Sequence, residues 1–341
     1  PARVPRGVPI ADLLTDFAGK QGQTATVAGR LGQVRDFGKL RFAHVADRTG
    51  SLQVGFQRDS MPAFWPNRRL VEGNDLVSIT GKLGTTQKGE PTLWAEEVTL
   101  ASKSLRPAPE KWHGLQDQEQ RYRMRYVDLT VNPEVRETFI KRTKLIKTIR
   151  AYLDELGLLE VETPILQPIH GGASARPFKS HHNTLDMPLY MRIANELYLK
   201  RLIVGGFDGV YEMGKMFRNE GMDRTHNPEF TMLEFYVAYK DYFWLMDVTE
   251  TMLERVARAL SPDGGAVMRV GDHDINFAGP YTRLTMFDAI QQYTGLNVET
   301  ADESALRNYC RQNGIEIDAT MGKAKLIDEI FGERSEERRV G

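Results

Sequence analysis

The sequence contains very little cysteine and no long apolar run. Cys310 is the only cysteine in 341 residues, which excludes an internal disulfide and a zinc site built from several cysteines. No uncharged apolar segment approaches the roughly 18 residues that cross a bilayer. The N-terminus also lacks the charged and apolar pattern of a signal peptide. We therefore expect a globular cytoplasmic protein that does not contact a membrane.

An excess of charge of one sign is also absent. The 45 Lys and Arg residues are balanced by 46 Asp and Glu residues, so the formal net charge is −1. No global positive field is available to attract nucleic acid, and any basic surface must be local. A length of 341 residues with 41% hydrophobic residues is sufficient for about two domains with their own cores.

Short β-like runs separated by glycines and turn dipeptides are present between residues 24 and 101. Five such runs without a long helical period between them predict a small closed barrel such as an OB-fold. The predicted strands lie within residues 24–34, 40–47, 51–59, 75–84 and 92–100. Residues 104–114 contain prolines and no periodicity, which indicates a linker.

The pattern changes to α/β after residue 131. Asn132, Pro133 and the acid that follows form a helix start, apolar residues then recur at helical spacing, and Gly157 ends the helix. A strand is expected at 158–166, interrupted by Pro164. Further helices are expected at 195–204, 244–260, 284–293, 301–313 and 322–331.

Residues 209–239 predict two strands joined by a polar loop. Because side chains alternate along a strand, one face of this hairpin is apolar. That face contains Tyr211, Met213, Phe217, Leu233, Phe235 and Val237. The other face contains Glu212, Arg218, Glu220, Phe230, Glu234 and Tyr236.

A solvated sheet face with Arg–Glu pairs is one interpretation of this second face. Carboxylates mixed with Phe230, Met232 and Tyr236 are more typical of a half-buried ligand floor. A carboxylate beside apolar side chains is costly unless a cation or a hydrogen-bond donor contacts it. The second interpretation is that a substrate supplies this partner.

Several separated motifs resemble those of one enzyme family. The segments 217–220 (FRNE) and 226–230 (HNPEF) resemble motif 2 of the class II aminoacyl-tRNA synthetases, and the helix and strand ending at Pro164 resemble motif 1. The segments 171–173 (GGA), 192–194 (RIA) and 196–201 (ELYLKR) narrow the resemblance to the lysyl-tRNA synthetases. It extends from about residue 5 to residue 333.

The resemblance implies an α+β fold with an all-β N-terminal domain. An OB-fold anticodon-binding domain is expected at 1–103 and a linker at 104–131. The N-terminal part of a class II catalytic domain, an incomplete antiparallel sheet flanked by helices, is expected at 132–333. The implied activity is lysine–tRNA ligation, in which ATP activates L-lysine as lysyl-adenylate and the lysyl group passes to the 3′ end of tRNA(Lys).

The same resemblance assigns the ATP contacts. Arg218 is the catalytic residue and contacts the ATP α-phosphate and the lysine carboxylate, as a planar, permanently charged guanidinium is suited to do. Glu220 accepts a hydrogen bond from the adenine amino group, and Phe230 stacks on the purine. His226 and Asn227 reach the terminal phosphates. Taken alone, His226 is an ordinary surface histidine.

Lysine carries two ammonium groups, so its pocket requires carboxylates in two places. The resemblance assigns Glu234 and Tyr236 to the side-chain end, and Glu196 with Gly172 to the α-amino end. The residues alone do not orient the substrate, and Glu196 is also explained as a first-turn helix acid. Asn195 departs from the family, which usually has proline there, and we expect it only to alter the helix cap.

The barrel is expected to bind the anticodon. Phe42 is placed to stack on an unpaired base, Gln53 and Glu97 match positions that read base edges, and Arg35 is assigned to a phosphate or a base. An aromatic residue in a small barrel is more often part of the core. The neighbouring Arg41 and His44 favour an exposed binding face.

The family pattern continues beyond residue 333, whereas residues 334–341 do not follow it. The motif 3 arginine and the Mg²⁺-binding carboxylates are expected in that continuation, so no metal ligand is assigned in this chain. We expect the intact enzyme to be a homodimer and this polypeptide alone to be inactive.

Three alternatives were weighed. The first is a tRNA-binding module without catalysis. The second is an aspartyl- or asparaginyl-tRNA synthetase, disfavoured because Glu196 and Glu234 repel an acidic substrate. The third is a lysyl transferase acting on an elongation factor, which lacks the barrel.

Overall fold

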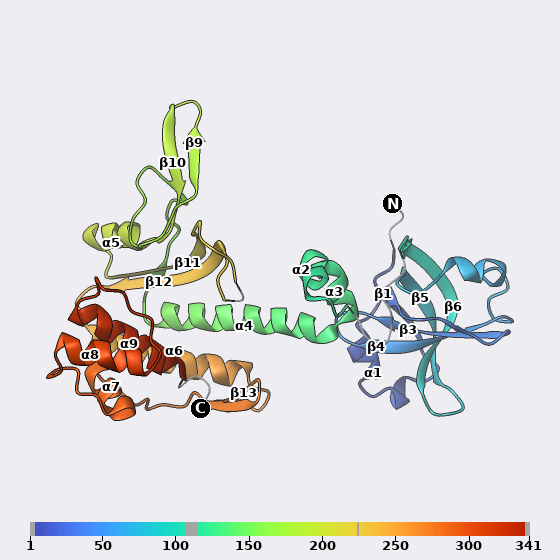
Figure 1. Cartoon of the computed structure of the whole chain (residues 1–341). Coiled ribbons are helices and arrows are strands. Elements are labelled where there is room, and N and C mark those ends of the chain that lie inside the picture. The colour runs from blue at the N-terminus through green and yellow to red at the C-terminus, as the bar shows by residue number, and fades with distance from the viewer. Residues whose placement is uncertain (1–3, 107–114, 224, 338–341) are drawn as a thin grey trace. The chain divides into compact units, whose positions relative to one another are not determined.

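A computed structural model of the chain describes residues 4–106, 115–223 and 225–337. The chain divides into two compact units, Pro1–Phe139 and Ile140–Gly341. Figure 1 shows that the first unit is dominated by strands and that the second combines strands with helices. Each unit is described by itself below.

The first unit is built on a closed barrel. Its strands are β1 (Thr24–Leu31), β2 (Arg35–Asp36), β3 (Leu40–Ala46), β4 (Ser51–Gln57), β5 (Leu76–Thr85) and β6 (Pro91–Ser102). They are ordered β1-β5-β6-β4-β3-β2, and pairing of β1 with β3 closes the barrel. Strands β4 and β6 are parallel and the other pairs are antiparallel. The predicted OB-fold is confirmed.

Alternation along the strands sorts the barrel side chains. On β3, Ala43 and Val45 are fully buried, whereas Phe42 and His44, which alternate with them, are half-buried and face outward. The short helices α1 (Ile10–Leu14), η1 (Ala18–Lys20) and η2 (Trp65–Leu70) lie around the barrel. Ile10, Leu13 and Trp65 from these helices join the barrel core.

Two helices lie in the segment expected to be a linker, α2 (Gln118–Arg123) and α3 (Arg125–Val131). They are held by Asp128, which is fully buried and accepts hydrogen bonds from Arg121, Arg125 and Asn132. Buried, paired charges of this kind fix a local structure that hydrophobic periodicity does not reveal. Residues 107–114 of the expected linker lie outside the described residues.

The long helix α4 (Pro133–Glu155) begins and ends as predicted and leads to the central sheet of the second unit. This sheet has the order β7-β11-β12, with β7 (Leu159–Glu160) parallel to β11 (Gly209–Phe217) and β11 antiparallel to β12 (Glu229–Val237). Leu153 on α4 and Tyr211 on β11 are fully buried in one cluster. The helix therefore covers one face of the hairpin (Figure 1).

The expected strand at 158–166 is divided into two short strands, β7 and β8 (Leu166–Gln167), with Pro164 between them. Strand β8 pairs with β10 (Met187–Met191), which pairs with β9 (Lys179–His182). Helices α5 (Glu196–Val204) and α6 (Tyr242–Leu260) follow where predicted, and β13 (Val267–Val270) and β14 (His273–Asn276) form a hairpin.

The last three helices form a separate small core. They are α7 (Met286–Thr294), α8 (Glu303–Gln312) and α9 (Lys323–Glu337), close to the predicted ranges. Ile290, Leu306, Leu326 and Ile330 are buried together with Cys310, which is completely inaccessible. Part of the predicted non-family tail, 338–341, lies outside the described residues.

Candidate functional site

The β11–β12 hairpin has the two faces that the sequence predicts. Glu212 pairs directly with Glu234, Val210 with Tyr236 and Met216 with Phe230. These residues share the face opposite to the one on which Leu233 and Phe235 pack against Tyr211 and α4. The covered face anchors the hairpin. On the other face these β11 residues are buried, whereas Phe230, Glu234 and Tyr236 of β12 are half-buried and can contact a ligand.

Glu234 and Tyr236 form the centre of this second face. The Tyr236 hydroxyl donates a hydrogen bond to a Glu234 carboxylate oxygen at 3.3 Å. Burial raises the pKa of Glu234, and the negative charges of Glu196 and Glu212 raise it further, while Arg218 opposes this shift. A half-buried carboxylate that is hard to ionise alone is stabilised by a cationic ligand.

Glu196 begins α5 and lies close to the same face. Its carboxylate binds the Lys200 ammonium group, with 2.5 Å between Oε1 and Nζ, and this ammonium lies 5.5 Å from the centre of the Tyr236 ring. Gly172 packs against Glu196 with φ of +85°, where an added Cβ would lie 3.0 Å from the Glu196 Cβ. This side of the pocket therefore already attracts an ammonium group.

Arg218 follows β11 and lies over the Phe230 ring, with 5.1 Å between the guanidinium carbon and the ring centre. Its Nε is buried and has no hydrogen-bond partner among the described residues. A buried, unpaired guanidinium nitrogen is costly, so an anionic ligand would stabilise this side chain. Arg218 and Phe230 are thus brought together as the sequence predicts.

The remaining predicted ATP residues occupy the loop between the strands. Glu220 accepts a hydrogen bond from the backbone N–H of Arg176 at 3.3 Å, and the carbonyl of Arg176 accepts one from Asn219. His226 is exposed, and its Nδ1 lies 2.9 Å from an Asp223 carboxylate oxygen. Hydrogen bonds from the Thr225 backbone and from His226 lower the pKa of Asp223. The side chain of His226 contacts Thr225 and Asp223, and the structure does not bring it to Arg218 or Phe230.

A buried charged cluster around Glu212, on the same face of the hairpin as Glu234, was not predicted. The Glu212 carboxylate is 3% exposed and binds Arg192, which is 2% exposed. Thr163 donates a hydrogen bond to Glu212 Oε2 at 2.6 Å, and Asn195 donates one to the same oxygen at 3.1 Å. The only signal in the sequence was the position of Glu212 on the polar face of the hairpin.

The expectation for Asn195 is corrected by this cluster. Asn195 precedes α5, but its side chain makes no hydrogen bond to the helix N-terminus. Its amide instead points to Glu212 and is completely buried. Asn195 thus uses its side chain for a tertiary hydrogen bond to a buried carboxylate. It does not use it for the local hydrogen bond to a helix N–H group that residues at this position commonly make.

In the barrel, Phe42 lies in an outward-facing aromatic group and is not part of the core cluster. The centre of its ring is 5.8 Å from that of Trp94 and 6.3 Å from that of Phe37, both edge-on. Gly55 lies beneath them, because an added Cβ there would lie 2.6 Å from Trp94. This group offers a surface for a stacked base.

The other predicted anticodon residues differ in accessibility. Gln53 is 4% exposed, accepts a hydrogen bond from Arg35 at 3.2 Å and donates one to Thr92 at 2.9 Å. Its amide therefore positions Arg35 and is not open to solvent. Glu97 is exposed on β6.

The expectation that Arg41 contributes to an exposed face is wrong. Arg41 is 6% exposed, and its guanidinium donates to the carbonyl groups of Arg68 and Val71 at η2. On β3 it alternates with Phe42 and therefore points inward, where the free carbonyl groups of the η2 turn require a donor.

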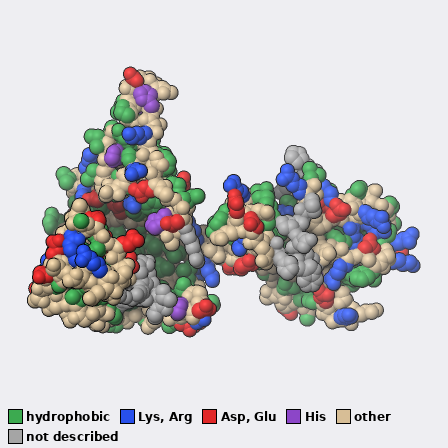
Figure 2. Space-filling model, in the orientation of Figure 1, with side chains coloured by type: hydrophobic (Ala, Val, Ile, Leu, Met, Phe, Trp, Pro, Cys, Tyr) green, Lys and Arg blue, Asp and Glu red, His purple; other side chains and the backbone are tan. Residues whose placement is uncertain are grey.

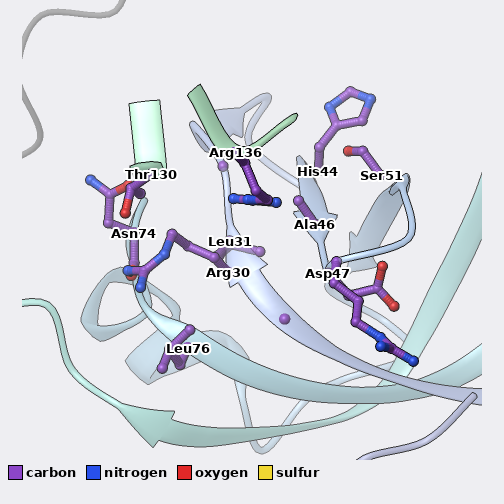
Figure 3. Close-up of a pocket in the computed structure, with 13 residues that line it drawn as sticks. Arg30, Leu31, His44, Ala46, Asp47, Ser51, Asn74, Leu76, Thr130 and Arg136 are labelled. Carbon is purple, nitrogen blue, oxygen red and sulfur yellow. The ribbon is translucent and has the colours of Figure 1, made fainter. Parts of the chain in front are cut away.

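A cavity at the barrel has a volume of about 470 Å³. Its lining includes Arg30, His44 and Asn74, with Arg136 from α4 (Figure 3). Arg30 donates to the carbonyl of Asn74 at 2.8 Å. The Asp47 carboxylate in the same cavity accepts hydrogen bonds from the backbone of Ile10 and Thr49. These polar groups stabilise the barrel.

The described part of the chain contains no helix that combines the length and apolar character needed to cross a membrane. Within the same residues, no group of three or more His, Cys, Asp or Glu side chains is arranged to hold a metal ion. Figure 2 shows Lys and Arg side chains interspersed with Asp and Glu over the visible face, in agreement with the near-zero net charge.

Comparison with known proteins agrees with this geometry. Residues 117–328 match the family described as tRNA synthetases class II (D, K and N), and residues 25–101 match the OB-fold nucleic acid binding domain. The chain belongs to the class II tRNA synthetases of the D, K and N group.

Several similar curated proteins are named lysine–tRNA ligase. The chain is 52% identical to the protein from Christiangramia forsetii over 332 residues, which are 93% of this chain and 58% of that protein. It is 46% identical to a protein from Porphyromonas gingivalis, covering 97% of this chain and 60% of the relative. The protein from Azobacteroides pseudotrichonymphae is 47% identical, with 91% and 65% covered. The chain thus spans about three-fifths of the length of these relatives.

Proposed function

We propose that this protein functions in lysine–tRNA ligation, by binding L-lysine and ATP on the β11–β12 face and tRNA(Lys) on the barrel. The observation that supports this most directly is the proximity of two carboxylates, Glu196 and Glu234, which repel each other, to Arg218, whose Nε has no partner among the described residues. A substrate with two ammonium groups and one carboxylate complements these charges.

In this proposal the lysine side-chain ammonium binds Glu234 and the Tyr236 hydroxyl. The α-ammonium binds Glu196 beside Gly172, where a side chain would collide. The contact between Lys200 Nζ and the Glu196 carboxylate supports this assignment, because it puts an ammonium group on that carboxylate. The incoming α-ammonium group would displace Lys200 from that carboxylate.

ATP is placed beside lysine. Phe230 stacks on the purine, Glu220 accepts from the adenine amino group, and His226 and Asn227 bind the terminal phosphates. The pairing of Arg218 with Phe230 supports this placement, since it puts a cation at the edge of a stacking surface. The described residues include no group of three or more His, Cys, Asp or Glu side chains arranged to hold Mg²⁺.

Arg218 acts where negative charge develops. A lysine carboxylate oxygen attacks the ATP α-phosphorus, the new P–O bond forms and pyrophosphate leaves. The guanidinium group of Arg218 binds both the attacking carboxylate and the α-phosphate, so it aligns them and stabilises the transition state. In the second step the terminal tRNA hydroxyl attacks the lysyl carbonyl carbon and AMP leaves.

The barrel is proposed to bind the anticodon through Phe42, with Arg35, Gln53 and Glu97 around it. We also propose the homodimer that the motif 1 resemblance implies, with α4 at the interface. Phe139 and Ile140 on α4 are 46% and 53% exposed, which gives this helix an apolar surface to bury.

Lysine binding separates this proposal from the main alternatives. We expect isothermal titration calorimetry to detect L-lysine binding to the chain and no binding of L-aspartate or L-asparagine. A tRNA-binding module without a substrate pocket would bind none of the three. Binding of aspartate in preference to lysine would support the aspartyl- or asparaginyl-tRNA synthetase alternative and contradict the assignment of Glu196 and Glu234.

A further inference from the structure

Asn195 connects the start of α5 to the strand below it. Its side chain does not cap the helix, and its Nδ2 donates to Glu212 Oε2 at 3.1 Å. Its Oδ1 is buried and has no partner among the described residues. An unpaired buried acceptor is unfavourable, so the donor contact with Glu212 is the interaction that this side chain gains.

The other end of this contact is fixed. Glu212 is held by Arg192 and by the Thr163 hydroxyl, and its carboxylate is 3% exposed. Gly214 leaves the space for the Arg192 guanidinium, because a Cβ at this position would collide with it. Glu212 is therefore a rigid anchor on β11, held by paired charges that are protected from water.

The two residues joined by this contact each adjoin one of the proposed lysine-binding carboxylates. Asn195 immediately precedes Glu196 in the chain, and Glu212 lies directly opposite Glu234 in the strand register. The hydrogen bond between Asn195 and Glu212 consequently links the start of α5, which carries Glu196, to the β11–β12 hairpin, which carries Glu234.

We propose that Asn195 is a positioning residue that sets the distance between Glu196 and Glu234, and thereby the length of the diammonium substrate that the pocket accepts. This inference rests on the proposed function. Asn195 acts through Glu212 and does not touch the substrate. Without its contact, α5 would be free to shift relative to β11, and the pocket would discriminate less well between substrates of different length.

The distance between the two carboxylates can be tested by comparing the affinities of two substrates of different length. L-ornithine has the same charged groups as L-lysine but one methylene fewer, so its two ammonium groups are closer together. The ratio of the two dissociation constants therefore reports the spacing of the carboxylates, whereas a general loss of stability lowers both affinities alike.

Thr163 provides a matched control. It donates to the same Glu212 oxygen as Asn195 but belongs to the segment between β7 and β8 and is not attached to α5. Thr163→Val removes one donor from Glu212 at almost constant volume. If Asn195 acted only by donating a hydrogen bond to Glu212, loss of either donor would change the substrate preference equally.

The test is calorimetric titration of the full chain with L-lysine and L-ornithine, for wild type, Asn195→Ala and Thr163→Val. We expect Asn195→Ala to lower the preference for lysine by about five- to tenfold, the effect of one hydrogen bond. Thr163→Val should change the preference by less than about twofold, and ATP affinity should stay within about twofold in both variants. If Asn195→Ala does not fold, Asn195→Ser removes the reach of the amide with a smaller change.

An unchanged preference in folded Asn195→Ala or Asn195→Ser would overturn the inference, as would an equal loss in Thr163→Val. Failure of the wild-type chain to bind lysine would instead reject the proposed function on which the inference depends. Circular dichroism and the melting temperature of each variant identify a loss of fold.

Discussion

Glu234 shows most clearly how one residue can be unfavourable for the fold and favourable for the ligand. We predict that Glu234→Gln weakens lysine binding, because it leaves the substrate ammonium without a charged partner. Since Glu234 is only half-buried, the expected loss is about 2 kcal/mol, at the lower end for a charge pair removed from water. Calorimetry with L-lysine measures it, with ATP affinity as the control. A change in lysine affinity below twofold would remove Glu234 from the site.

The raised pKa of Glu234 also predicts a pH dependence. A carboxyl group whose pKa is higher in the folded than in the unfolded state stabilises the fold at low pH, and this contribution is lost as the pH rises through the folded-state pKa. At pH 7 the ionised side chain therefore opposes folding. We predict that ligand-free Glu234→Gln melts at a higher temperature than wild type at pH 7, and that this difference disappears near pH 4. An equal difference at both values would contradict the assignment.

Phe42 is the residue on which the proposed barrel function depends. We predict that Phe42→Ala lowers the affinity for tRNA with a lysine anticodon by about 1–3 kcal/mol, the value of one stacked base. Because Phe42 is outside the barrel core, the circular dichroism spectrum should not change, and neither should lysine binding. Filter binding with tRNA(Lys) and with a tRNA of another anticodon provides the comparison. A loss of barrel structure would show that Phe42 is structural.

Strand periodicity was sufficient to predict which residues of the hairpin share a face, including Glu234 and Tyr236. It did not predict the partners of buried polar groups. In the sequence, Arg41 and Asn195 resemble surface residues. The partners of Arg41 are backbone carbonyl groups at η2, and the partner of Asn195 is a carboxylate on β11, far away in the chain. Such contacts depend on the tertiary fold and have no local signature.

At the scale of elements, the hydrogen bonds of the Arg41 guanidinium connect β3 to η2. We predict that Arg41→Met destabilises the barrel, because the carbonyl groups of Arg68 and Val71 lose their donor. Each unsatisfied buried group costs about 1–3 kcal/mol, which corresponds to a decrease of roughly 10 °C in melting temperature for a domain of this size. Arg69→Met is the matched control, since Arg69 is exposed on the same short helix. Similar melting temperatures for the two variants would show that the contact is unimportant.

The positions of most elements follow from apolar periodicity and from glycine and proline. The strand expected at 158–166 was too long because Pro164 lacks a backbone donor, which separates β7 from β8. Helices α2 and α3 were not predicted. Both are short, and they are held together by the hydrogen bonds of the buried Asp128, which apolar periodicity does not reveal. The domain limits 1–103, 104–131 and 132–333 stay a prediction.

At the scale of the whole molecule, the place of β12 at the edge of its sheet predicts whether this polypeptide can form lysyl-tRNA. Within the described residues, β12 is the last strand of its sheet, and its outer edge is unpaired. We predict that the 341-residue chain alone forms no detectable lysyl-tRNA, because Glu234 and Tyr236 lie on a strand supported on one side only. A chimera continued with the C-terminal part of the Christiangramia forsetii relative should form it. Equal aminoacylation by the chain and the chimera would contradict this prediction.

The buried Cys310 has a practical consequence for folding experiments. It is the only thiol of the chain, it is enclosed in the α7–α9 core, and burial raises its pKa, so the reactive thiolate is scarce in the native state. A thiol reagent can therefore modify the chain only when these three helices open. The rate of this reaction therefore measures how often the α7–α9 core opens. The measurement needs no introduced label and does not depend on the barrel.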